Sequence, residues 1–407
     1  MWPVLQQLLT RGAAALKFFI AAYLLGPEQI GLFGMALVVM AIVEGASDTG
    51  LAQAIVQSRR EPSRSQLGAG WTLQVTRGCL IGLAISCLAN PISELFAAPS
   101  VGPLLLLLAL WPVLKGLGNP GAIVSLRNRK FKRLFFTESA AALLDATMTV
   151  FLIVAFGISA PALVLGSLCG ELAKLAASWT VLRTPLLIST RWRIIGRWVS
   201  YGKWIWASSL VVLLLNNFDK VVVAKFTSPA DFGVYTVAFK IAQLLIAEPA
   251  VAFGQYLFPT LSRMASSGHR EVIAYFCRVF RSLVVFVGAI CGFLALGAWA
   301  VPDIPSSKWS GVQEILQIAA ITMFQAALIS SLVAFFRATG KPWLVTKAVL
   351  LQFVVLVASA WLLVPILGIF GAAGASAIAH AATLALLLIN LKTSHQRLIP
   401  FDGRDQS

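Results

Sequence analysis

The chain has 407 residues, of which 58% are hydrophobic and only 12% are charged, and its mean hydropathy is +0.85. A soluble globular domain carries about 25% charged residues, so this composition excludes a soluble protein and indicates a polytopic membrane protein. The formal net charge of +16 does not indicate nucleic-acid binding, because the basic runs are short loops between apolar stretches and form no continuous solvated face.

Apolar windows of about 20 residues predict twelve membrane-spanning helices and therefore an all-α fold. The first span is unusually polar for a membrane helix, so we expect it to line an internal surface. In chain order the spans are expected at 5–25, 30–53, 67–89, 103–124, 134–156, 160–182, 201–224, 232–258, 276–299, 312–336, 343–364 and 368–391.

The charges of the connecting loops predict the orientation of these spans. The loops after even-numbered spans, together with the tail after the last span, contain 19 lysines and arginines. The loops after odd-numbered spans contain only Lys225 and Lys308. Cytoplasmic loops carry the excess of basic residues, so both termini are predicted to be cytoplasmic.

Ionisable residues inside the spans are the candidates for function, because a charge at the bilayer centre costs about 2.5–3.5 kcal/mol on insertion scales. Eleven bases and seven acids lie within the predicted spans, and this positive excess favours an anionic substrate. Each base could instead have a structural partner or extend to the interface. The five bases expected to form a cationic substrate site are Arg11, Lys17, Arg77, Lys220 and Lys240.

Three carboxylates are candidates for ion coupling. Glu44 and Asp48 are four residues apart and share a helix face, where neighbouring carboxylates raise each other's affinity for a proton. A helix cap or a salt bridge is the alternative role for Asp48. Asp145 lies in the middle of the fifth span, and its alternative role is a hydrogen bond to a neighbouring helix.

No catalytic residue, metal site or cofactor is predicted. All five cysteines fall inside spans, where a small buried apolar role is expected, and their positions predict no disulfide. A membrane glycan polymerase or ligase would need a long outward loop or domain, whereas the longest outward loops are about a dozen residues each. We therefore do not expect an enzyme.

The sequence repeats at half its length. Pro27 and Gly31, which follow the first span, match Pro229 and Gly233 at an offset of 202 residues, and in both copies an apolar residue precedes the glycine. Six spans are an even number, so two repeats would have the same orientation, an arrangement typical of transporters with a central substrate site. The predicted parts are an N-terminal lobe at 1–182, a cytoplasmic linker at 183–200, a C-terminal lobe at 201–391 and a cytoplasmic tail at 392–407.

These stretches resemble the polysaccharide transporters, Wzx-type flippases of the multidrug/oligosaccharidyl-lipid/polysaccharide exporter superfamily. The resemblance depends on the order and spacing of short motifs along nearly the whole chain. The motifs are LGPEQIG at 25–31, DTGLAQAIVQ at 48–57, RKFKR at 129–133, NNFDK at 216–220, FGVY at 232–235, LFPTLSR at 257–263 and RATGKP at 337–342.

The resemblance implies a V-shaped pair of six-helix lobes around a cationic cavity in the bacterial inner membrane. It also implies export of undecaprenyl-diphosphate-linked oligosaccharide repeat units for surface polysaccharide synthesis by alternating access. The implied partners are the lipid-linked substrate, membrane lipid, and the polysaccharide polymerase and export machinery. The alternative is a cation-coupled drug antiporter of the same superfamily, for which acids rather than bases would be expected to dominate the interior.

Overall fold

The computed structural model describes residues 2–47, 55, 61–185, 210, 213–264, 269–297 and 309–396. Every regular element in these residues is a helix, which confirms the all-α prediction. The chain divides into two compact units, Met1–Gly233 and Val234–Ser407. The predicted lobes and linker remain predictions, because residues 186–209 lie outside the described part of the chain.

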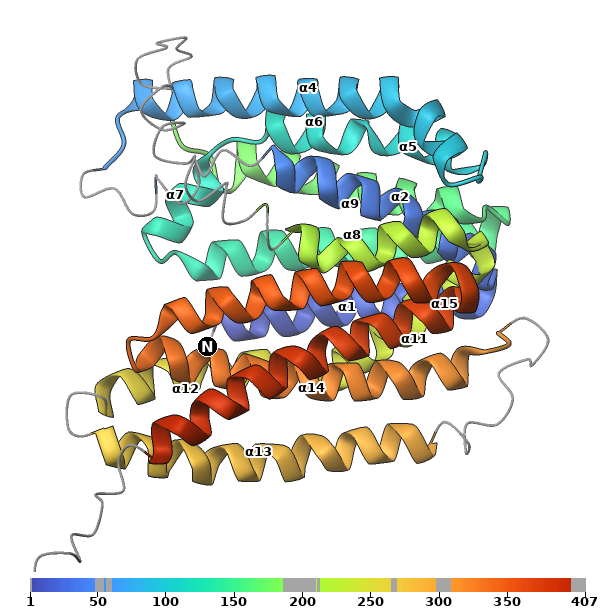
Figure 1. The fold of residues 1–407 in the computed structure, drawn as a ribbon. Coiled ribbons are helices and arrows are strands. Elements are labelled where there is room, and N and C mark those ends of the chain that lie inside the picture. The colour runs from blue at the N-terminus through green and yellow to red at the C-terminus, as the bar shows by residue number, and fades with distance from the viewer. Residues whose placement is uncertain are drawn as a thin grey trace, which may run out of the picture. The chain divides into compact units, whose positions relative to one another are not determined.

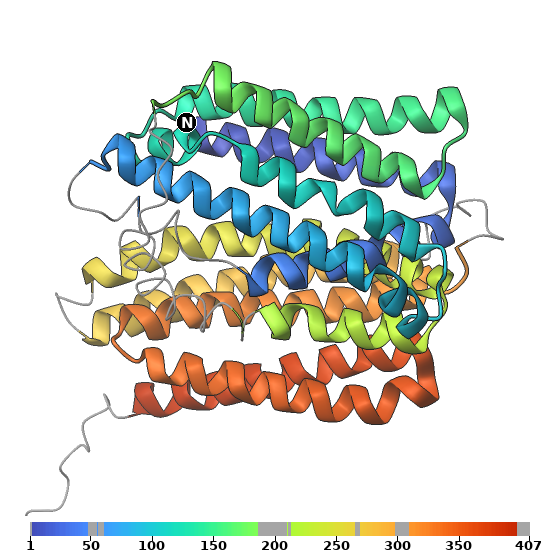
Figure 2. The ribbon, with the colours of Figure 1, turned by 90° about the horizontal axis from the view of Figure 1, so that it is seen from above.

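In the described residues, the first unit contains five long helices, one broken helix, the helix at 213–226 and the start of the helix at Pro229. Figure 1 shows these elements. Figure 2 shows α8 and α9 side by side. The long helices are α1 (Trp2–Leu25), α2 (Pro27–Ala46), α4 (Arg64–Leu95), α8 (Phe131–Phe156) and α9 (Ala160–Thr180).

The fourth predicted span is broken rather than straight. It consists of α5 (Val101–Leu108), α6 (Leu110–Leu117) and α7 (Gly121–Arg127), and α7 is bent by 58° from the helices before it. Polar side chains satisfy the backbone at the break: the Asn119 N–H donates to Ser178 Oγ at 2.9 Å, and Asn119 Oδ1 accepts from the Gly121 N–H at 2.9 Å. Non-helical backbone at membrane depth requires such partners, because lipid supplies none.

The second unit is also helical. Its elements are α12 (Glu248–Met264), α13 (His269–Gly297), α14 (Val312–Ala338) and α15 (Pro342–Gln396), while α11 (Pro229–Ala242) crosses the boundary between the units. A π-helical turn, η1 (Gln243–Ala247), joins α11 to α12 directly before Pro249. Single π turns of this kind accommodate local breaks in the helical hydrogen-bond ladder.

The element α15 is two helices joined at Gly368, whose φ of 55° and ψ of −130° are not helical. The two parts pack in opposite directions, since Ser359 Oγ donates to the Ala375 carbonyl and Gln352 Nε2 lies 3.1 Å from His380 Nε2. Figure 1 shows the second part of α15 turning back along the first. The separate spans predicted at 343–364 and 368–391 therefore exist.

In the described residues, nine helices are long and apolar enough to cross a membrane, or ten if the bent pair is one span. That count takes α15 once and does not include the helix at 213–226, whose neighbouring residues lie outside the description. The predicted bounds differ mainly at α2, which ends at Ala46 rather than near 53, and at α13, which begins at His269 rather than 276.

The repeated Pro-x-x-x-Gly segments pack against each other within the first unit. A Cβ atom added at Gly31 would overlap the carbonyl oxygen of Pro229, and one added at Gly233 would overlap the carbonyl oxygen of Pro27. Each glycine thus makes room for the backbone of the other copy. Such close approach of helix backbones is what small residues permit in membrane proteins.

Candidate functional site

The site lies where α8 packs closely against α9. Gly166 and Gly170, in the sequence GSLCG, form a Gly-x-x-x-Gly motif on α9. A Cβ at Gly166 would overlap Thr149 Oγ1, and a Cβ at Gly170 would lie 2.9 Å from Asp145 Cβ. The motif therefore lets the two helices approach at the level of Asp145.

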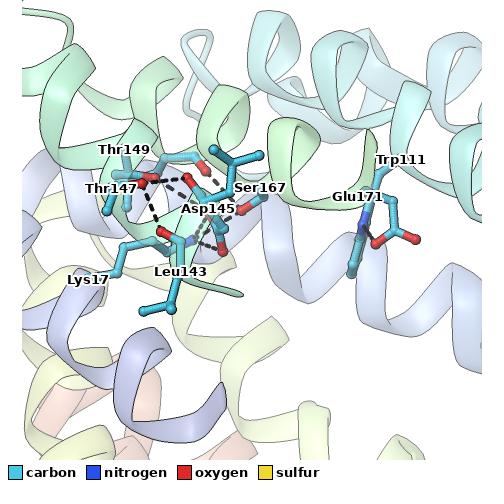
Figure 3. Close-up of polar contacts among 10 residues, drawn as sticks. Lys17, Trp111, Leu143, Asp145, Thr147, Thr149, Ser167 and Glu171 are labelled. Atoms are coloured by element: carbon cyan, nitrogen blue, oxygen red, sulfur yellow. Dashed lines mark hydrogen bonds and ion pairs between the residues drawn. The ribbon is translucent and has the colours of Figure 1, made fainter. Parts of the chain in front are cut away.

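Asp145 is held in an ion pair with Lys17 of α1 (Figure 3). Lys17 Nζ donates to Asp145 Oδ1 at 2.8 Å and Oδ2 at 2.9 Å, and it lies 3.1 Å from Ser167 Oγ. Thr149 Oγ1 donates to Asp145 Oδ1 at 3.5 Å. The Lys17 side chain is 9% exposed and that of Asp145 is 23% exposed, so the acid is the more solvent-accessible member of the pair.

Two further polar contacts lie beside this pair. Lys174 Nζ of α9 forms an ion pair with Glu138 Oε2 of α8 at 3.1 Å. Trp111 Nε1 of α6 donates to Oε2 of the buried Glu171 at 3.0 Å, as Figure 3 shows. Ser167, Glu171 and Lys174 are spaced i, i+4 and i+7, so one face of α9 carries all three.

Two cavities adjoin this face. One of about 370 Å³ is lined by Asp145, Ser167, Glu138, Glu171 and Lys174, together with Gln6 and Thr10 of α1. The other, of about 280 Å³, shares Trp111, Glu138, Glu171 and Lys174 with the first. The carboxylate of Asp145 therefore faces a polar cavity that can admit water, which a group that exchanges protons requires.

A second charged group surrounds the C-terminal end of α2. Lys115 of α6 forms an ion pair with Glu44. Arg77 of α4 donates from Nη2 to the Glu44 carbonyl oxygen at 2.7 Å and from Nε to Ser47 Oγ at 3.2 Å. Arg77 thus adds a charged donor to a carbonyl that also accepts from the Ser47 N–H and Ser47 Oγ, and its charge suits the negative end of the helix dipole.

The structure separates the five predicted bases into different environments. Lys17 is buried and paired with Asp145, while the half-buried Arg77 caps α2. Lys220 is half-buried and donates to the Asn216 carbonyl at 2.8 Å. Arg11 is exposed on α1 and Lys240 is half-buried on α11. None of the five is among the described residues that line the two cavities.

The candidate coupling residues are also separated. Asp145 does bond to a neighbouring helix, which was the alternative considered for it. Glu44 is paired with Lys115, and Asp48 lies outside the described residues. In the described part of the chain no group of three or more His, Cys, Asp or Glu residues is arranged to hold a metal ion.

Sequence analysis did not place Trp111, Glu138, Glu171 and Lys174 among the functional residues. The signal that was available is the spacing of Ser167, Glu171 and Lys174 on one face of α9, next to the Gly-x-x-x-Gly motif. A helix face that combines small and ionisable residues marks the side that packs against other helices.

Long apolar helices with paired charges between them define a multi-pass membrane protein. The sequence model of the polysaccharide biosynthesis protein family matches residues 20–314, so the chain belongs to this family. The match confirms the resemblance seen in the short motifs.

Two curated relatives agree with this assignment. The chain is 23% identical over 398 residues to the lipopolysaccharide biosynthesis protein WzxC of Escherichia coli (strain K12), covering 96% of this chain and 77% of that protein. It is 22% identical over 343 residues to the succinoglycan biosynthesis transport protein ExoT of Rhizobium meliloti (strain 1021), covering 84% and 68%.

Solved structures show the same fold. An inward-facing multidrug resistance MATE family transporter of the MOP superfamily aligns with a TM-score of 0.74 at 15% identity, covering 96% of both chains. The lipid II flippase MurJ in an inward closed conformation aligns with a TM-score of 0.74 at 14% identity, covering 97% of this chain and 89% of that one. At these identities the likeness concerns the fold alone.

Proposed function

We propose that the protein is a flippase that exports undecaprenyl-diphosphate-linked oligosaccharide repeat units across the bacterial inner membrane for surface polysaccharide synthesis. The observation that carries the proposal is membership of the polysaccharide biosynthesis protein family over residues 20–314. The two relatives, a lipopolysaccharide biosynthesis protein and a succinoglycan biosynthesis transport protein, support it.

The cargo sets the physical requirements for the path. Its diphosphate cannot cross hydrocarbon, its sugars need a wet route, and its polyprenyl tail can stay in lipid. Arginine and lysine neutralise phosphate through charge-assisted hydrogen bonds. Arg77 and Lys220 have no ion pair with a described carboxylate, so we propose them as phosphate contacts together with Arg11, Lys17 and Lys240.

Lys17 can bind a phosphate only when its pair with Asp145 opens. We propose that Asp145 is the coupling carboxylate: a proton reaching it through the cavity of about 370 Å³ would neutralise it and release Lys17 for the substrate. Departure of the diphosphate and loss of the proton would restore the pair. Glu44 is a second candidate of this kind, in its pair with Lys115, and Asp48 is a third.

The membrane arrangement belongs to the same proposal. Both termini are cytoplasmic, the lobes comprise 1–182 and 201–391, and they rock about a central cationic cavity. The polysaccharide polymerase and export machinery are the proposed partners. A reporter enzyme that is active only outside the cytoplasm tests this orientation. It should be active when fused after residues 98, 158 and 227 and inactive when fused after residues 129 and 339.

Deletion of the gene tests the function. We expect loss of surface polysaccharide and accumulation of the lipid-linked repeat unit in the inner leaflet, both reversed by the wild-type gene. A strain that keeps its surface polysaccharide but loses resistance to cationic drugs would contradict the proposal and favour the antiporter alternative.

A further inference from the structure

One face of α13 carries a charge pattern that the proposed transport path does not use. Arg278, Arg281, Ser282, Val285 and Phe286 are all exposed and follow the i, i+3, i+4, i+7 and i+8 spacing of a single helix face. The opposite face is buried in the second unit through Phe276, Leu283 and Val287. An open region of about 910 Å³ follows the exposed face, and its described lining belongs to α13 alone, including the two arginines, Ser282, Val285 and Phe286.

The two arginines differ from the paired lysines of the first unit. Lys17, Lys115 and Lys174 each have a carboxylate partner. In contrast, neither the Arg278 nor the Arg281 guanidinium forms an ion pair or a hydrogen bond with any residue that the structure describes. A cation within a membrane span is expected to find a partner, and here the protein itself supplies none among the described residues.

The depth of these two arginines lets their side chains extend toward the lipid headgroups. The apolar helix Glu271–Leu296 has 26 residues and is about 39 Å long, so when it is centred on a hydrocarbon core of about 30 Å, the Cα atom of Arg278 lies about 6 Å and that of Arg281 about 10 Å inside the core. Helical side chains lean toward the N-terminus of their helix, which here is the nearer membrane surface. The Arg278 guanidinium can therefore reach the phosphate level, and the Arg281 guanidinium can extend toward it while its stem stays in hydrocarbon.

An apolar groove starts at the same place. It has a volume of about 520 Å³ and lies between η1 and α12 on one side and α13 on the other. Phe253, Tyr256, Tyr275, Phe286 and Ile290 line it; Arg278 lies one turn from its Tyr275 end, and Ser282 lies near its middle. From Tyr275 to Ile290 it follows the helix for about 22 Å, which is longer than one leaflet's hydrocarbon, about 15 Å, so a single acyl chain fits along it.

We propose that this face binds one anionic phospholipid of the bilayer, with its phosphate on Arg278 and Arg281 and one acyl chain in the groove between α12 and α13. The combination fits a phospholipid, in which an anionic headgroup is attached to an apolar chain. In the same way, the two arginines adjoin the apolar groove. Basic pockets between membrane helices bind anionic lipid headgroups in this way. A free phosphate would leave the apolar groove unused, and a zwitterionic lipid would leave the two positive charges uncompensated.

Lipid binding to the purified full-length protein tests the proposal. In native mass spectrometry, dioleoylphosphatidylglycerol should bind to the wild-type chain at least tenfold more tightly than dioleoylphosphatidylcholine. The double variant Arg278→Gln, Arg281→Gln should lose about 10- to 30-fold in affinity for phosphatidylglycerol. Ser282→Phe, which fills the groove without changing any charge, should weaken binding as well. Arg64→Gln, at an exposed arginine that begins α4, is the matched control and should bind as the wild type does.

Four outcomes would overturn the proposal. Equal binding of the two phospholipids by the wild-type protein removes the role of charge, and this comparison needs no variant to fold. Displacement of phosphatidylglycerol by inorganic phosphate, with no effect of Ser282→Phe, identifies a free-anion site. Binding of undecaprenyl phosphate in place of phosphatidylglycerol assigns the face to the cargo, and a protein dimer that excludes lipid assigns it to a second copy of the chain.

Discussion

Lys17 in α1 and Asp145 in α8 form a two-oxygen ion pair across 128 residues of sequence. Because Ser167 and Thr149 add hydrogen bonds, the pair joins three helices at one point. Breaking a buried pair leaves one charge uncompensated, which costs about 3–5 kcal/mol, whereas removing both charges together costs far less.

The first prediction concerns this pair. Lys17→Met and Asp145→Asn should each lower the thermal inactivation temperature of the detergent-purified protein and abolish surface polysaccharide. The double variant should recover most of the stability but no export, because the lysine and the titratable acid are both gone. Differential scanning fluorimetry and a complementation assay measure the two effects in the same set of strains. Additive losses of stability in the double variant would show that the pair is not formed.

The second prediction concerns Arg77, whose two donors cap α2. If capping is its main contribution, Arg77→Lys and Arg77→Gln should both destabilise the protein, because a single ammonium group cannot reach the Glu44 carbonyl and Ser47 Oγ with the same geometry. If its charge binds the cargo, Arg77→Lys should keep part of the export activity that Arg77→Gln loses. We expect both effects together: comparable losses of stability, and export that only the lysine variant retains. Export by both variants at the wild-type rate would exclude Arg77 from the substrate path.

The third prediction concerns the Gly-x-x-x-Gly motif of α9. Gly170→Leu should push α8 away, because even a Cβ atom at this position meets Asp145 and the Ala141 carbonyl oxygen. Overpacking of this kind costs about 1–3 kcal/mol, and the displaced Asp145 should lose its contact with Lys17. One cysteine introduced at Gln6 of α1 and another at Ala142 of α8 can report the change in packing between these helices through their crosslinking rate. Gly292→Leu on α13 is the control, since a Cβ there meets nothing within 4 Å.

The fourth prediction concerns the contact between the repeated segments. Gly31→Ala and Gly233→Ala should each destabilise the protein by about 1–3 kcal/mol, because the added methyl group overlaps a backbone carbonyl that cannot rotate away. Gly12→Ala on α1, where nothing lies within 4 Å, should be neutral or stabilising by up to about 1 kcal/mol. Thermal inactivation of the three purified variants provides the comparison. Equal stability of all three would mean that the helices are not in close contact at these glycines.

The spans could be predicted from the sequence because a helix that faces lipid must be apolar along its whole length. The two parts of α15 were separated correctly, since Gly368 follows an apolar run that is already long enough to cross the membrane. The end of α2 was predicted too late because apolar residues resume at Leu51 after the polar run at 47–50, whereas the helix ends at Ala46, where Arg77 from another helix caps the backbone. Hydropathy contains no information about such a contact.

The site was harder to predict than the fold. Lys17 and Asp145 were each selected for being ionisable within a span, but their pairing depends on how α1 and α8 are placed side by side. The same applies to Glu138 with Lys174 and to Trp111 with Glu171, which come from different helices. Only contacts between residues three or four apart on one helix follow from periodicity alone. Counting charges along the chain therefore overstated how many lysines of the first unit remain uncompensated.

The contact between Gly31 and Gly233 has the pattern of an isologous interface formed inside a single polypeptide. In a symmetric dimer, residue i of one subunit touches residue j of the other, and j touches i in return. Here each glycine meets the proline carbonyl of the other copy in the same reciprocal way. A gene encoding only the first six helices could thus have formed the same contact with an identical copy of its product, and fusion of two such genes would have made that association permanent.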